Sequence, residues 1–387
     1  MNCQSENYSN RGVSYKKEDV QQAVKNLHPG LFAGAFCKIL PFKNRKSDIM
    51  ILHADTAGTK PLLNYLYWKE TGDLSVFRDL ARDAVVMNTD DILCAGLIDN
   101  FTISTTISRN KFLIPAEIIK ELIAGVEECA ELFRNYKIAA VTAGGETADA
   151  GDVIRTLDTG CTVFSCGKSS EIIDNSRIAP GLCIVGLESS GRAIYENAYN
   201  SGIGSNGLTS CRHDLFSSWY PEHFPEALDP YMPKEYAYTG KFRMNDPLPG
   251  TEITIGRAVI SPTRTYAPVM KEILPRFRKK IKGLVHCTGG GQTKCLKFSK
   301  QIHFIKNNLF IIPPLFRLIA EKTSMKEMWR VFNMGHRLEI FTDEKTASGI
   351  IEIAASFHIK AKIIGYTEPA AQNTCTISHE GVTYEYS

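Results

Sequence analysis

The feature that most constrains this chain is a short apolar run, Ile49–Leu52, that leads into the hexapeptide Asp55-Thr56-Ala57-Gly58-Thr59-Lys60. The apolar run predicts a buried β-strand. The strand therefore ends in a carboxylate, a flexible turn, two hydroxyls and an ammonium. A carboxylate can hold Mg²⁺, a glycine lets backbone approach a ligand, and a lysine can offset phosphate charge. The hexapeptide alone indicates a possible nucleotide-binding turn at the end of a strand.

The order of residues in the hexapeptide differs from the common phosphate-binding loop. That loop reads G-x-x-x-x-G-K-[ST] and is rich in glycine before its lysine. No segment of the chain matches it. A nucleotide bound by this protein must be held in another way.

Composition narrows the class of protein. The 387 residues suffice for two or three domains of about 150 residues each. The net charge of +3 does not favour a nucleic-acid or membrane partner, and no stretch approaches the roughly 20 apolar residues of a membrane span. The N-terminus has no basic region followed by an apolar block, so we expect no secretory signal. The eleven cysteines are scattered, which favours reduced, mostly buried thiols in a cytoplasmic protein and no zinc site.

From Leu31 onward, short apolar runs alternate with amphipathic stretches, which is typical of α/β or α+β layers. We expect a partly ordered N-terminal segment over 1–30, a first domain over 31–170 and a second over 171–387. The clearest helix spans 115–136, where apolar residues recur at helical spacing. The other expected helices span 76–90, 264–276 and 344–357, and the expected strands span 138–141, 161–166, 182–187 and 359–364. Residues 211–250 show little periodicity and predict a long surface excursion.

Glycine-rich segments recur at the ends of apolar runs. Besides the hexapeptide and residues 30–34, they are Gly144-Gly145-Glu146-Thr147, Ser205-Asn206-Gly207 and Thr288-Gly289-Gly290-Gly291. Successive backbone N–H groups in such turns form concave anion sites. Each segment alone is about as consistent with a simple tight turn. Several of them, mixed with Asp, Glu, Lys and Thr, favour a polyphosphate site with a metal.

The carboxylates Asp55, Asp90, Asp91 and Glu146 each follow an apolar segment and lie beside small residues. Carboxylate oxygens that join Mg²⁺ to phosphate oxygens are the expected use of such groups. Asp90 and Asp91 are equally consistent with a solvated helix end. His286 directly precedes Cys287 and a glycine-rich segment, so it is a candidate substrate ligand or acid–base group. A lone histidine is nevertheless more often a hydrogen-bonded structural residue.

In this order the motifs resemble the aminoimidazole ribonucleotide synthetase family, the phosphoribosylformylglycinamidine cyclo-ligases. The family belongs to a superfamily of ATP-dependent enzymes that includes formylglycinamidine ribonucleotide synthetase and selenophosphate synthetase. Its D-G-V-G-T-K looks like residues 55–60, and its G-G-E-T-A is intact at 144–148. The remaining matches are S-S-G at 189–191, S-N-G at 205–207, P-T-R-x-Y at 262–266, H-x-T-G-G-G at 286–291 and F-N-M-G at 332–335. The resemblance covers about residues 28–366, and the last three motifs together point to the cyclo-ligase branch.

The resemblance implies a two-domain α/β (α+β) subunit. Its N-terminal domain, residues 31–170, would bind ATP and pair with a second copy, the two sheets closing into a shared barrel. Mg²⁺ would be held by Asp55, Asp91 and Glu146, and Lys60 would offset phosphate charge. The other residues expected to contact ATP are Gly58, Thr59, Gly144, Gly145 and Thr147.

The resemblance also implies a substrate and a reaction. The C-terminal domain would close over the ribose phosphate of formylglycinamidine ribonucleotide through Ser205, Asn206, Gly207, Thr288, Gly289 and Gly290. In that family the amide oxygen is phosphorylated, the amidine nitrogen attacks, the imidazole ring closes and phosphate leaves. Positioning and electrostatics dominate such catalysis, and His286 and Lys60 are the candidate catalytic residues. We therefore expect a homodimer with ATP and Mg²⁺ as cofactors, and neither a nucleic-acid nor a membrane partner.

The chain departs from the family in loops expected to touch substrate. Gly204 stands where the family often has histidine, and residues 192–203 intervene where the family passes almost directly from S-S-G to S-N-G. Asp90 replaces an asparagine, and His336 and Arg337 stand where small or apolar residues are preferred. A related ATP-dependent phosphotransferase and a non-catalytic nucleotide-binding homologue thus remain alternatives. The retained carboxylates favour an enzyme.

Overall fold

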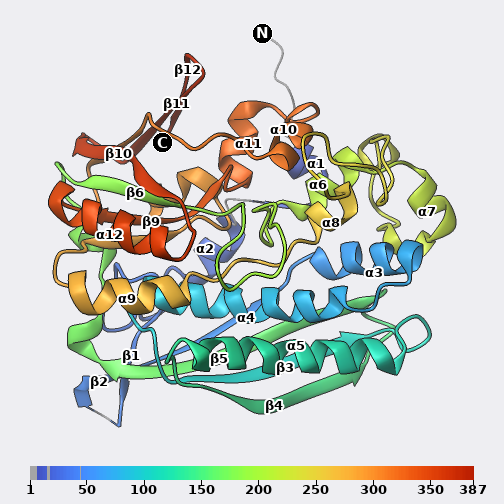
Figure 1. Ribbon diagram of the computed structural model, residues 1–387, viewed down its shortest axis with the longest axis horizontal. Coiled ribbons are helices and arrows are strands. Elements are labelled where there is room, and N and C mark those ends of the chain that lie inside the picture. The colour runs from blue at the N-terminus through green and yellow to red at the C-terminus, as the bar shows by residue number, and fades with distance from the viewer. Residues whose placement is uncertain (1–6, 15–17, 44) are drawn as a thin grey trace.

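The computed structural model describes residues 7–14, 18–43 and 45–387, and it contains two β-sheets packed with helices (Figure 1). The strand order of the first sheet is β1-β2-β5-β3-β4. That of the second is β12-β11-β8-β10-β6-β9-β7. This mixed α/β architecture confirms the predicted α/β (α+β) class, and the barrel shared between two copies stays a prediction.

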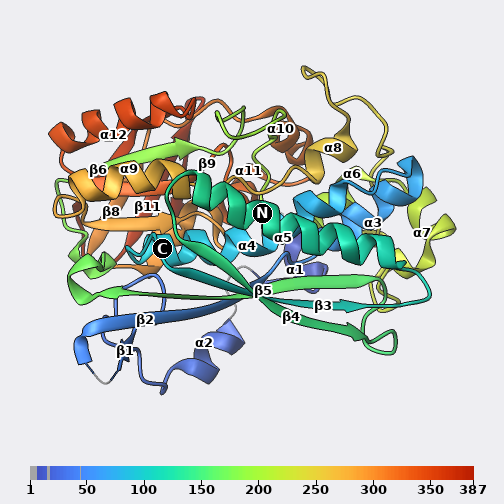
Figure 2. The same cartoon turned by 60° about the horizontal axis from the view of Figure 1, so that its bottom comes forward.

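The first sheet has one face covered by two long helices, α4 (Val76–Cys94) and α5 (Ala116–Asn135) (Figures 1 and 2). Strands β3 and β4 are parallel, and the other neighbours are antiparallel. The opposite face leaves Leu52 and Val141 64% and 56% exposed. The strands are β1 (Leu40–Phe42), β2 (Arg45–Thr56), β3 (Phe101–Arg109), β4 (Ala140–Asp149) and β5 (Leu157–Lys168).

The second sheet is mostly antiparallel, with β11 and β8 as its parallel pair. Helix α12 (Glu344–Ser356) packs on its strands β6 and β10, and α9 (Ala267–Phe277) packs against α12 and α4. Every residue of β9 is buried. The strands are β6 (Cys183–Glu188), β7 (Gly283–His286), β8 (Ile302–Lys306), β9 (His336–Thr342), β10 (Ala361–Pro369), β11 (Thr374–His379) and β12 (Val382–Tyr386).

Helix α4 lies between the two sheets, since it contacts β2 and β5 of the first and β7 of the second. The remaining helices are α1 (Asn7–Asn10), α2 (Glu18–Val24), α3 (Lys60–Thr71), α6 (Leu208–Leu215), α7 (Trp219–His223), α8 (Ile255–Val259), α10 (Pro314–Ala320) and α11 (Met325–Val331). Short 3₁₀ turns are η1 (Ser169–Glu171), η2 (Asn175–Arg177), η3 (Pro225–Ala227), η4 (Lys234–Tyr236) and η5 (Gly291–Lys297). Within the described ranges, every helix is too short or too polar to cross a membrane.

Elements with a strong period or a clear cap are confirmed. The predicted helix over 115–136 is α5, and the predicted strand over 182–187 is β6. The helix predicted over 344–357 is α12, and it begins at a side-chain cap, because the Asp343 side chain accepts a hydrogen bond from the Thr346 N–H at 2.9 Å. Such a bond satisfies one of the N–H groups that a helix start leaves open.

The expected turn at residues 144–147 is wrong. These residues lie inside β4, the edge strand of the first sheet. The register between β3 and β4 shifts between Ile103 and Thr105, which accommodates an extra residue on β4. A Cβ added at Gly145 would lie 2.2 Å from the carbonyl oxygen of Thr105, so the glycine serves close strand approach rather than a turn.

The expected surface excursion over 211–250 is also wrong. The segment starts within α6 and adds buried side chains to the core, among them Phe216, Tyr220 and Met244. Aromatic rings and arginines pack together there, with the Arg243 guanidinium carbon 3.3 Å from the ring centre of Trp219. This segment therefore packs into the core although its apolar residues do not recur at helical or strand spacing.

Candidate functional site

A hydrogen-bonded chain of side chains joins the two sheets through α4. His53 on β2 contacts Asn88 on α4 through Nδ1 at 2.9 Å and the Asp91 carboxylate through Nε2 at 3.5 Å. The other oxygen of Asp91 lies 2.7 Å from Nδ1 of His286 on β7. Arg337 on β9 donates from Nε to Nε2 of His286 at 3.0 Å. Four distant segments thus converge on Asp91.

Arg337 fixes the protonation pattern of His286. A guanidinium only donates hydrogen bonds, so Nε2 of His286 accepts and Nδ1 carries the proton that is donated to Asp91. The ring is fully buried, and its two nitrogens are both engaged within the protein. The structure therefore places His286 behind Asp91, where it orients that carboxylate.

The pKa values of the neighbouring carboxylates Asp90 and Asp91 shift in opposite directions. Burial acts to raise the pKa of Asp91, but the hydrogen bond from His286, together with the Lys294 charge, holds that pKa below its ordinary value. Burial raises the pKa of Asp90, which accepts from the Thr265 hydroxyl and the Tyr266 N–H. Both residues lie inside α4 and are buried, so the alternative of a solvated helix end is wrong.

Asp55 lies at the end of β2, on the same strand face as His53, because side chains alternate along a strand. Its carbonyl oxygen is 3.4 Å from Nδ2 of Asn88, and its Oδ1 accepts from the Thr56 N–H at 2.8 Å. His53 and Asn88 both lie beside Asp91 as well. The structure therefore brings Asp55 and Asp91 together.

Lys60 is directed away from solvent. Its ammonium lies 2.7 Å from Oδ1 of Asp83 and 2.5 Å from the carbonyl oxygen of Ser261, and both side chains of the ion pair are fully buried. Burial lowers the pKa of Lys60 even though the Asp83 charge opposes that shift. In this arrangement Lys60 holds the base of the hexapeptide turn to α4 and to the segment after α8.

The predicted substrate loops meet the hexapeptide at the same place. The Ser205 hydroxyl donates to Oδ1 of Asp83 at 3.1 Å, and the Ser205 carbonyl oxygen would be 3.5 Å from a Cβ added at Gly58. Nδ2 of Asn206 would lie 3.8 Å from a Cβ added at Gly289. Three loops that are distant in sequence thus face one another.

Gly207 closes this arrangement at the N-terminal end of α6. Its φ of 76° is left-handed, and a Cβ there would lie 2.3 Å from the ring of Phe332 in the F-N-M-G segment. Thr288 is separated from His286 only by Cys287, and its N–H donates to the His286 carbonyl at 2.8 Å. Gly290, with a φ of 104°, turns the chain into η5. Thr288, Gly289 and Gly290 are thereby fixed next to the Asp91–His286 pair.

Glu146 lies apart from the other predicted metal ligands within one chain. The pairing Thr56–Gly160–Thr106–Glu146 puts Glu146 on the open face of the first sheet. Asp55 pairs with Cys161 on the helix-covered face. Three strand spacings of about 4.8 Å, roughly 14 Å in all, separate β2, which carries Asp55, from β4, which carries Glu146. Gly144 and Thr147 share the β4 edge with Glu146, and Gly145 packs on Thr105.

The oxygens of Asp55 and Asp91 match the ligand preference of Mg²⁺, a hard cation. Asp91 already accepts from His286, and Nε2 of His53 lies 3.5 Å from its other oxygen. A carboxylate offers about four lone-pair positions, so room for a cation is left. A second group of metal-ligand types is Cys287, His336 and Glu339, all buried. There the Lys306 ammonium bonds to Glu339 and supplies the positive charge that a metal would bring.

Sequence reasoning missed several residues of the site. His53 and Asn88 carried a usable signal, because they stand two residues before Asp55 on a strand and three before Asp91 on a helix. Asp83 carried none, because its partners come from distant segments. Arg337 was noted only as a departure from the family, and its contact with His286 appears only in the fold. Arg212 on α6, also missed, lines a pocket beside the hexapeptide.

Comparison with known proteins agrees with the motifs. Residues 37–165 match the N-terminal domain of AIR synthase related proteins, and residues 250–378 match the C-terminal domain. The phosphoribosylformylglycinamidine cyclo-ligase of Methanococcus vannielii is 30% identical over 383 residues, 97% of this chain and 91% of the relative. The chain belongs to the AIR synthase related family. Members of this superfamily are ATP-dependent enzymes.

Other comparisons extend the likeness. The cyclo-ligase of Methanocaldococcus jannaschii is 28% identical over 360 residues, 91% of this chain and 85% of that protein. Among solved structures, T. maritima PurL complexed with FGAR has a TM-score of 0.57 at 13% identity. The match covers 96% of this chain but 49% of PurL, so this chain spans about half of that longer protein. A HypE–HypF complex matches with a TM-score of 0.55 at 12% identity, covering 95% of this chain and 98% of that one. These two likenesses establish the fold.

Proposed function

We propose that this AIR synthase family member closes formylglycinamidine ribonucleotide to aminoimidazole ribonucleotide, with ATP converted to ADP and phosphate. One observation carries the proposal. The hexapeptide, the Ser205–Gly207 loop and the Thr288–Gly290 loop meet beside the Asp91–His286 pair. This happens in a chain that is similar over nearly its whole length to proteins named for that reaction.

The chain's own residues would mainly position and polarise the reactants. Phosphate transfer from ATP to the amide oxygen makes that oxygen a good leaving group, and attack by the amidine nitrogen then closes the ring with loss of phosphate. Thr59 and the backbone of Gly58 would donate to the transferred phosphate. Lys60, held by Asp83, would contribute its charge from behind the turn rather than by direct contact.

His286 would act through Asp91. Its Nδ1 proton fixes the carboxylate that faces the reacting groups, and Arg337 keeps the ring in that tautomer. Ser205, Asn206, Gly207, Thr288, Gly289 and Gly290 would hold the substrate. Mg²⁺ bound by Asp55 and Asp91 would neutralise phosphate charge.

We further propose that the enzyme is a homodimer joined by the open face of the first sheet. Leu52 and Val141 lie on that face and are more than half exposed, which favours burial against a second copy. Glu146 lies on the same face, so a second copy is the route by which this carboxylate could approach an ATP site. The two sheets would then close into a barrel.

One feature favours a second candidate, a related ATP-dependent phosphotransferase with a different substrate. A Cβ added at Gly204 would lie 3.6 Å from Nη1 of Arg337. The guanidinium thus occupies the space beside Gly204, at the start of the proposed substrate loop. A cation in that place could select another anionic substrate.

The deciding experiment incubates the purified protein with ATP, Mg²⁺ and formylglycinamidine ribonucleotide, and follows ADP and aminoimidazole ribonucleotide together. We expect both products in equal amounts. ADP formation without the imidazole would reject the cyclo-ligase and favour the second candidate. Absence of both products, with ATP still bound, would favour a binding protein.

A further inference from the structure

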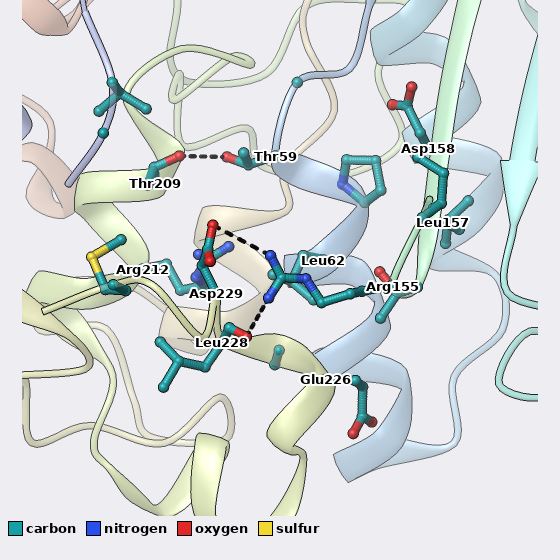
Figure 3. Close-up of a pocket in the computed structure, with 18 of the residues that line it drawn as sticks. Thr59, Leu62, Arg155, Leu157, Asp158, Thr209, Arg212, Glu226, Leu228 and Asp229 are labelled. Atoms are coloured by element: carbon teal, nitrogen blue, oxygen red, sulfur yellow. Dashed lines mark hydrogen bonds and ion pairs between the residues drawn. The ribbon is translucent and has the colours of Figure 1, made fainter. Parts of the chain in front are cut away.

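A pocket of about 400 Å³ lies beside the hexapeptide turn and shares Gly58 and Thr59 with it (Figure 3). Its walls come from the N-terminal segment at Arg11–Val13, the turn at Gly58 and Thr59, the start of β5, and α6. Residues 226–232, in the segment mistaken for a surface excursion, complete it.

The pocket contains a buried guanidinium with open donors. Arg212 is 5% exposed, and its Nε and Nη1 have no hydrogen-bond partner among the described residues. Its Nη2 lies 3.1 Å from Nε2 of His213. A buried charge without acceptors costs free energy, so a site of this kind is retained where a ligand supplies the acceptors.

The His213 contact leaves Arg212 without an acceptor. The Tyr238 N–H donates to Nδ1 of His213 at 3.1 Å, so a neutral ring must carry its proton on Nε2. The ring is neutral because burial, together with the charges of Arg212 and Arg11, lowers the pKa of His213 to about 2. Its Nε2–H therefore faces the Arg212 Nη2, a second donor. The Arg212 guanidinium is thus left without an acceptor among the described residues.

Further donors surround the same space. The Thr59 and Thr209 hydroxyls lie 3.1 Å apart at one edge of the pocket (Figure 3). Thr209 and Arg212 are three residues apart on α6 and so share a helix face. Helix α6 has eight residues and no side-chain cap, so its first-turn N–H groups are open to an anion.

The other charges of the pocket are already matched. Arg11 donates to Asp214, to Ser210 and to the Tyr236 carbonyl. Arg155 donates to the Leu228 carbonyl at 2.5 Å and pairs with Asp229 at 3.3 Å, as Figure 3 shows.

The remaining two acids of the pocket are accounted for as well. Glu226 accepts from the Tyr65 hydroxyl at 2.5 Å. Burial raises the pKa of Asp158, and its carboxylate accepts from the backbone N–H of Thr159. Arg212 is therefore the charged side chain of the pocket that has donors to spare for a ligand.

We propose that this pocket binds a phosphate group of one of the two substrates, with Arg212 as its main ligand and Thr59, Thr209 and the start of α6 as further donors. The inference rests on the proposed function for the identity of those substrates. The phosphate can belong to ATP or to the ribose 5′-phosphate of the second substrate, and the experiment separates these sources.

The test measures equilibrium binding by calorimetry for Mg²⁺–ATP, formylglycinamidine ribonucleotide and inorganic phosphate. The variants are Arg212→Met, which keeps the apolar stem, and Arg212→Lys, which keeps the positive charge but lacks the planar guanidinium and its several N–H donors. Arg155→Met is the matched control, since it lines the same pocket but its donors are used within the protein. We expect Arg212→Met to weaken binding of inorganic phosphate and of one substrate by about 10- to 100-fold. We expect the affinity of Arg212→Lys to lie between those of the wild type and Arg212→Met. Arg155→Met should change affinity by less than about threefold.

The melting temperature of the ligand-free variant shows whether a loss of affinity comes from misfolding. Without ligand, the Tm of Arg212→Met should equal or exceed that of the wild type, because the variant removes a buried cation that has no acceptor. Loss of affinity for ATP alone, or for the ribonucleotide alone, would support the site and name its source. Wild-type affinity of folded Arg212→Met for all three probes would overturn it, as would failure of the wild-type protein to bind any of them. A wild-type protein that binds phosphate at Arg212 but forms no imidazole would reject the proposed function and leave this site standing.

Discussion

The buried Lys60–Asp83 pair gives the sharpest energetic test of how the hexapeptide is held. Both side chains are fully buried, and Oδ1 of Asp83 also accepts from the Thr263 N–H at 2.8 Å and from the Ser205 hydroxyl at 3.1 Å. Asp83→Ala would leave the ammonium buried without its counter-charge. Breaking a buried pair in this way costs about 3–5 kcal/mol of unfolding free energy. We expect a loss of that size in urea denaturation.

The double variant Lys60→Met, Asp83→Leu separates structure from chemistry. Replacing both charges by apolar groups of similar volume is often close to neutral, so we expect it to recover at least about 2 kcal/mol relative to Asp83→Ala. It should nevertheless lose at least about tenfold in ATP turnover, because the charge behind the turn is gone.

Asp229→Ala is the control for this experiment. It breaks the half-exposed pair with Arg155 and should cost less than about 1 kcal/mol. A loss below about 1 kcal/mol in Asp83→Ala, or simple additivity in the double variant, would refute the reasoning.

Three further outcomes are expected. Asp55→Asn should abolish Mg²⁺-dependent ATP turnover while leaving the circular dichroism spectrum unchanged; wild-type turnover would remove Asp55 from the site. His213, whose pKa burial lowers to about 2, should stay neutral in the folded state, so stability is complete above the ordinary pKa of about 6.5 and is lost as pH falls below it. The unfolding free energy should therefore fall by about 1 kcal/mol per pH unit more steeply in the wild type than in His213→Gln between pH 6.5 and 5, and equal slopes would contradict this. Leu52→Asp on the open sheet face should convert a dimer to a monomer in sedimentation equilibrium, whereas a persistent dimer would move the interface elsewhere.

The parts of the fold that were predictable from sequence are those with a local signal. The apolar period over 115–136 predicted α5, and the apolar run before the hexapeptide predicted the strand β2. The turn expected at Gly144–Thr147 failed because glycine serves two physical purposes. It frees backbone in turns, and it also permits close strand approach, as at Gly145 against Thr105.

The motifs of the site were predictable from the sequence, but the contacts between its side chains were not. The sequence placed Asp55, Asp91 and the Ser205 and Gly289 loops together, and the structure brings them to one region. It assigned Lys60 to phosphate, whereas the structure gives its ammonium to Asp83. It passed over Arg212, because an arginine without an acceptor can be recognised only once its surroundings are known.

The central claim is that this chain couples ATP cleavage to imidazole ring closure at the convergence of these loops. The most direct measurement is the ratio of aminoimidazole ribonucleotide to ADP formed from formylglycinamidine ribonucleotide, ATP and Mg²⁺. We expect one imidazole for each ADP, with both products lost in Asp55→Asn. ADP release without ring formation, or ring formation unaffected by Asp55→Asn, would contradict the claim.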